Sequence, residues 1–86
     1  MKEDILKAYK NEKDKIDIWF RMAVSDNITR NKKDDIIGCI FQIGKAYMLA
    51  QILQTDFGED TKSDREHMKQ VRDYLQFDFL ESLEAE

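Results

Sequence analysis

The sequence contains no proline and only three glycines, one cysteine and one histidine among its 86 residues. All-β domains need frequent glycine and proline at their turns, so this composition excludes that class. The single cysteine, Cys39, cannot form an intramolecular disulfide, which excludes the disulfide-rich secreted mini-proteins. A zinc site needs several Cys or His ligands, and Cys39 and His67 alone do not supply them. We therefore expect no metal site.

Motifs for nucleotide cofactors and for helical metal-dependent hydrolases are also missing. Neither of the phosphate-binding patterns GxxxxGK[ST] and GxGxxG occurs. The most apolar segment has no Asp or Glu between Ile36 and Thr55, whereas helical magnesium sites need several inward-facing carboxylates. We therefore expect no cofactor, no catalytic residue and no enzymatic activity.

Targeting and membrane-spanning segments are not expected either. Residues 1–4 are largely charged and lack the apolar stretch of a signal peptide. The longest apolar stretch, Ile36–Leu53, approaches membrane-spanning length but is interrupted by Gln42, Lys45 and Gln51, which favours a buried helix. The sequence thus predicts a cytoplasmic protein with no membrane partner.

Helical spacing of apolar residues predicts three long helices, at residues 2–24, 33–55 and 63–83. Gly58 is a natural residue to close the second helix, and the capping box Ser63-x-x-Glu66 predicts the start of the third. The connections are short, so neighbouring helices should pack antiparallel. We predict an all-α, up-down-up bundle in a single domain, residues 1–86, with the second helix at its centre.

The second helix carries more apolar surface than two neighbouring helices can cover. Its polar stripe consists of Asp35, Gly38, Gln42 and Lys45, and the rest of its circumference is almost entirely apolar. A helix that is apolar nearly all round is normally buried, and a contiguous exposed patch usually marks an interaction site. We therefore predict a homodimer that completes the bundle, because twofold dimers are the commonest oligomers. The predicted interface residues are Ile37, Phe41, Met48 and Ile52 on the second helix, with Phe77 and Leu80 on the third.

These features indicate a small non-enzymatic helical module for protein–protein interaction, acting as an adaptor, regulator or inhibitor of an unidentified protein partner. Its Lys-, Ile- and Asp-rich composition is typical of small accessory proteins of low-GC bacteria, their phages or mobile elements. A compact monomer that buries the whole second helix is the competing interpretation.

Two further functions stay open as alternatives. Residues 59–86 carry four Lys or Arg and nine Asp or Glu, a net charge of −5, so we do not expect nucleic acid as a partner. This acidic segment suits a nucleic-acid mimic that inhibits a DNA- or RNA-binding protein. Its candidate residues are Asp64, Asp73, Asp78, Glu81, Glu84 and Glu86. The one basic cluster, Arg30, Lys32 and Lys33, would instead serve a DNA-binding regulator.

Overall fold

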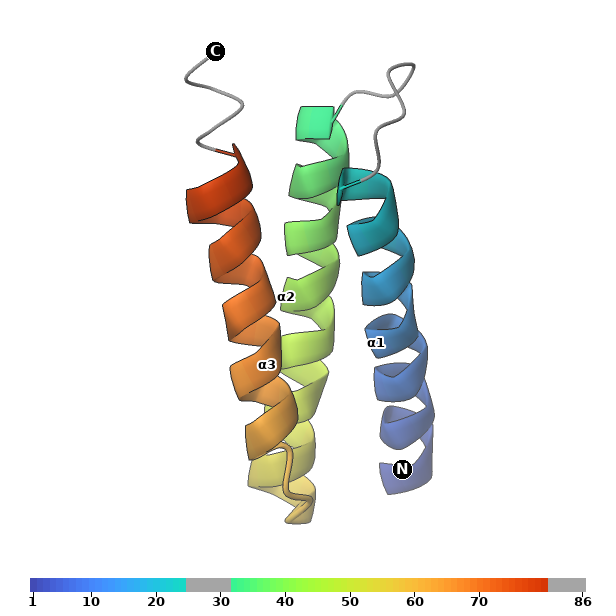
Figure 1. Ribbon diagram of the computed structural model, residues 1–86. Coiled ribbons are helices and arrows are strands. Elements are labelled where there is room, and N and C mark those ends of the chain that lie inside the picture. The colour runs from blue at the N-terminus through green and yellow to red at the C-terminus, as the bar shows by residue number, and fades with distance from the viewer. Residues whose placement is uncertain (25–31, 81–86) are drawn as a thin grey trace.

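The computed structural model describes the backbone of residues 1–24 and 32–80. Within these ranges it describes the side chains up to and including Phe77. The chain forms helices α1 (Lys2–Val24), α2 (Lys32–Phe57) and α3 (Lys62–Asp73), and α3 continues directly into a π-helical segment, η1 (Tyr74–Leu80). α1 and α3 run in the same direction, and α2 runs in the opposite direction between them (Figure 1). The predicted all-α arrangement of three helices is confirmed. The predicted bounds lie within two residues for α1, α2 and the start of α3, whereas the third helix is α-helical only to Asp73 and continues as η1.

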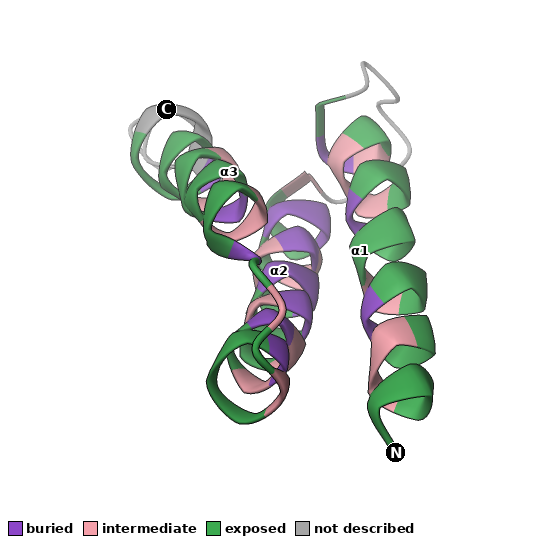
Figure 2. Ribbon diagram, turned by 90° about the horizontal axis from the view of Figure 1, so that it is seen from below, coloured by how far each residue is buried: buried purple, intermediate pink, exposed green. Residues whose placement is uncertain are grey.

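The hydrophobic core lies mainly between α1 and α2. Tyr9, Ile16 and Ala23 of α1 are buried there, whereas among the described side chains α3 and η1 each contribute one buried apolar residue, Met68 and Leu75. The core residues of α2 are Ile36, Cys39, Ile43, Ala46, Ala50 and Leu53. Seen from below, the buried side of α2 faces both neighbours (Figure 2). By length and composition α2 could also cross a membrane, which is a property that core helices share.

α1 packs against the side of α2 that carries the polar stripe. Asp35 and Gln42 are buried, at 4% and 5% exposure. The Gln42 Nε2 donates a hydrogen bond to the backbone carbonyl of Glu12 at 2.9 Å and another to the Glu12 carboxylate. The Gln42 hydrogen bond is the main cause that lowers the pKa of Glu12 from its ordinary value. Gln42 and Gly38 of the polar stripe thus form a helix–helix contact with α1, whereas Lys45 of the same stripe is exposed to solvent.

The connection between α2 and α3 is fixed by hydrogen bonds at the end of α2. Gly58 has a φ of 70°, its N–H donates to the Gln54 carbonyl at 3.2 Å, and the next N–H donates to the Leu53 carbonyl at 3.0 Å. These bonds satisfy carbonyls that the end of a helix leaves unpaired. The prediction that Gly58 closes the second helix is confirmed.

The predicted capping box at the start of the third helix is wrong. α3 begins at Lys62 after Thr61, so Ser63 and Glu66 already lie inside the helix. The Thr61 hydroxyl is buried and donates to the Ala50 carbonyl at 2.8 Å, while Asp60 accepts a hydrogen bond from the Lys62 N–H. The loop is therefore anchored to α2, and that tertiary contact sets the start of α3.

A polar cluster around Asp64 joins α1 directly to α3. The Tyr9 hydroxyl donates to the Asp64 carboxylate at 2.8 Å, and the Lys13 ammonium lies 3.2 Å from the same oxygen. Burial, followed by the contact with Asp64, raises the pKa of Tyr9. The Tyr9 hydrogen bond is the main cause that lowers the pKa of Asp64 below its ordinary value.

We expect Tyr9→Phe to lower the free energy of unfolding by about 1 kcal/mol near neutral pH, because a hydrogen bond to a partly exposed carboxylate is lost. The Asp64 pKa is lowered in the folded chain, so its stabilising effect exists above the unfolded pKa and disappears as pH falls through the folded pKa. Urea titrations should therefore show the variant and the wild type converging as pH falls through the lowered pKa of Asp64 in the folded chain. Tyr47→Phe is the matched control, and an equal loss in both variants would contradict the prediction.

Candidate interaction surface

Three large apolar side chains on the outer side of α2 are exposed to solvent. Ile37, Phe41 and Met48 are 51%, 68% and 63% exposed, and their spacing of four and seven residues places them on one line along the helix. We call these three residues the outer stripe. Single exposed apolar side chains are ordinary, whereas contiguous exposed apolar patches are typical of interaction sites.

The outer stripe is exposed because the opposite side of α2 is the one that fits α1. Gly38 lies against the Trp19 ring so closely that an added Cβ would be 2.6 Å from a ring carbon. Ala46 and Ala50 are also small and completely buried. Small side chains allow close helix approach, so packing selects this side of α2 and leaves the larger side chains facing outward.

Basic side chains border the outer stripe on both flanks. The Lys45 ammonium lies 5.3 Å from the centre of the Phe41 ring, within the range of a cation–π contact. On the other flank, a shallow groove of about 370 Å³ separates α2 from Lys69 and Arg72 of α3. The α2 residues that line this groove include Ile40, Gly44, Tyr47 and Met48. This basic border was not foreseen from the sequence, in which Lys69 and Arg72 belong to a helix with many acids.

The remaining predicted interface residues have different surroundings. Ile52 continues the line of the outer stripe but is half-buried. Phe77 is 53% exposed on η1, where Leu75 is buried, and it does not line the groove beside Met48. The side chain of Leu80 lies outside the described residues. The structure thus brings together the predicted residues of α2, and places Phe77 on a separate element.

The two alternative sites are only partly described. Among the acidic residues, Asp64 is engaged by Tyr9 and Lys13, and Asp73 lies 3.2 Å from Arg72. The side chain of Asp78, and residues 81, 84 and 86, lie outside the described part of the chain. So does Arg30 of the basic cluster, while the Lys32 ammonium donates to the Met22 carbonyl at 3.4 Å.

Two residues with intrinsic chemical reactivity, Cys39 and His67, lie in different environments. Burial, together with the nearby Asp17 charge, raises the pKa of the Cys39 thiol to about 11, and the nucleophilic form of cysteine is the thiolate. His67 is exposed on α3. Within residues 1–24 and 32–80, no three His, Cys, Asp or Glu side chains form a group that could hold a metal ion.

Comparison with protein-family models, with curated proteins and with solved structures finds no match to this chain.

Proposed function

We propose that this chain is a small, non-enzymatic helical module for protein–protein interaction that acts in the cytoplasm as an adaptor, regulator or inhibitor of another protein. Within this proposal it forms a twofold homodimer through the outer stripe of α2. The observation that carries the proposal is the exposure of Ile37, Phe41 and Met48, each more than half open to solvent on one line.

Burial of the outer stripe against a second copy is favourable because it removes apolar surface from water in both copies. Completely burying a side chain of this size contributes about 1.5–3 kcal/mol, and a twofold contact buries each one twice. Gly44 lies on the same side of α2 with open space around it, so a second backbone can approach there. Association also costs translational and rotational freedom, and the stripe is short, so we expect a dissociation constant on the order of 10 µM.

Light scattering coupled to size-exclusion chromatography tests the proposal. The mass should rise from the 10.2 kDa of one chain toward twice that value as the loaded concentration increases from about 1 to 500 µM. A mass that stays at one chain throughout this range would contradict self-association. A mass that continues to rise beyond a dimer would contradict the closed twofold arrangement.

A further inference from the structure

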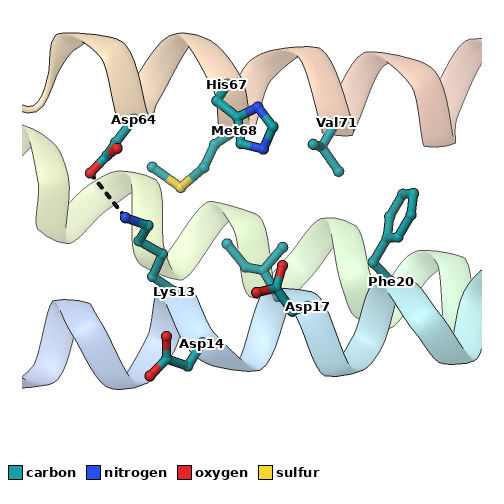
Figure 3. Close-up of a pocket in the computed structure, with 9 residues that line it drawn as sticks. Lys13, Asp14, Asp17, Phe20, Asp64, His67, Met68 and Val71 are labelled. Carbon is teal, nitrogen blue, oxygen red and sulfur yellow. Dashed lines mark hydrogen bonds and ion pairs between the residues drawn. The ribbon is translucent and has the colours of Figure 1, made fainter.

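A second surface, distinct from the outer stripe, lies between α1 and α3. It is a groove of about 410 Å³ (Figure 3). Its apolar residues are Ile16 and Phe20 of α1 and Met68 and Val71 of α3. Both helices line it over eight residues, from 13 to 20 on α1 and from 64 to 71 on α3, which corresponds to about 10 Å of helix.

Polar and aromatic contacts define the two ends of this groove. At one end, the Asp64 carboxylate is held by the Tyr9 hydroxyl and the Lys13 ammonium, and the contact of Lys13 with Asp64 spans from α1 to α3 in Figure 3. At the other end, the rings of Phe20 and Tyr74 are 6.3 Å apart. Between these contacts, α1 and α3 run in the same direction without closing on each other, and α2 lies behind them.

The charge that is left unpaired around the groove is negative. Lys13 is already engaged by Asp64. Asp14 and Asp17 are exposed on the rim and form no hydrogen bond or ion pair within the described residues. An apolar floor with uncompensated carboxylates along its α1 rim is complementary to a ligand that has an apolar side and a positively charged flank.

We propose that this groove binds a partner's amphipathic helix whose apolar face carries Lys or Arg on its flanks. Such a helix would lie beside α1 and α3 as the fourth member of a four-helix bundle, with two or three apolar side chains at i, i+3 or i+4, and i+7 in the groove. The inference rests on the proposed interaction role and names the chemistry of the partner. It does not depend on the homodimer, because the outer stripe and the groove share no residue.

The test uses two synthetic amphipathic peptides that have the same apolar positions. One carries Lys on both flanks and the other carries Glu, and each is titrated with the full chain by fluorescence anisotropy. We expect saturable binding of the Lys peptide with a dissociation constant on the order of 10 µM, and binding of the Glu peptide that is at least about tenfold weaker. Raising the salt concentration should reduce this preference.

Charge reversal on the rim distinguishes peptide binding in the groove from general electrostatic attraction between an acidic protein and a cationic peptide. The double variant Asp14→Lys/Asp17→Lys should bind the Lys peptide at least about tenfold more weakly than the wild type does, and it should bind the Glu peptide more tightly. Asp56→Lys/Glu66→Lys makes the same change in net charge elsewhere and should leave the preference almost unchanged. Equal binding of both peptides, no saturable binding, or equal effects of the two double variants would overturn the proposal.

The same titration distinguishes this inference from the proposed dimer. Phe41→Glu changes the outer stripe and should still bind the Lys peptide with the affinity of the wild type. If Phe41→Glu abolished peptide binding while Asp14→Lys/Asp17→Lys did not, the peptide would be bound on α2, and the groove would not be its site.

Discussion

Phe41→Glu is expected to leave a folded chain that is largely monomeric at about 50 µM, a concentration at which the wild type is largely dimeric. In the single protomer, the side chain at position 41 is mostly exposed, so a glutamate there is solvated. The introduced carboxylate would also stand four residues before Lys45, an arrangement that supports a helix by about 0.2–0.5 kcal/mol. In the dimer, the same carboxylate would replace an apolar contact and lose water in both copies. We expect the dissociation constant to rise by at least about 100-fold, or ~3 kcal/mol.

Circular dichroism tests whether the Phe41→Glu variant is folded, and light scattering tests whether it is monomeric. Asn11→Glu is the matched control, because it makes the same change in charge at an exposed position of α1 and should leave both the helical signal and the mass unchanged. A variant that is folded and still dimeric would place the interface elsewhere. A variant that unfolds would mean that the outer stripe belongs to the core, which its exposure contradicts.

The helices were predictable because the local signals agree along most of the chain. Apolar residues recur at helical spacing, proline is absent, and Gly58 stands where a helix must end. The start of α3 was not predictable to the residue, because the buried bond from Thr61 to the Ala50 carbonyl is a tertiary contact. A capping-box pattern at Ser63 reads only local sequence and therefore placed the start too late.

The sequence pattern of α2 does not determine how this helix is rotated about its own axis relative to α1. Periodicity shows that the helix has too much apolar surface for two neighbours, but it does not show which sector α1 occupies. The structure resolves this through the close contact of Gly38 with Trp19 and the hydrogen bonds of Gln42 to Glu12. These contacts turn Gly38 and Gln42 inward and the outer stripe outward. The positions of Lys69 and Arg72 beside Met48 likewise depend on how α3 is rotated about its axis.

Gly38→Ala and Gly44→Ala are expected to change stability in opposite directions, although both replace a glycine within the same helix. Alanine is a better helix former than glycine by about 1 kcal/mol, and nothing lies within 4 Å of a Cβ at Gly44, so that variant should gain about this amount. A Cβ at Gly38 would lie 2.6 Å from a Trp19 ring carbon, so α1 must shift or the ring must leave its position. Overpacking of this kind costs about 1–3 kcal/mol, and because the gain in helix propensity is common to both variants, they should differ by about this amount, with the 2.6 Å approach favouring the upper half of the range.

Urea unfolding of both variants in the Phe41→Glu background measures this difference without a contribution from association. Trp19 is the only tryptophan, so its fluorescence emission should shift in Gly38→Ala and stay unchanged in Gly44→Ala. Replacing Trp19 with leucine removes the ring that the new methyl group meets, and a double-mutant cycle should then show most of the Gly38→Ala penalty disappearing. Equal stabilisation by the two alanines would mean that α1 does not approach α2 at Gly38. The side of α2 that faces outward would then have to be assigned again.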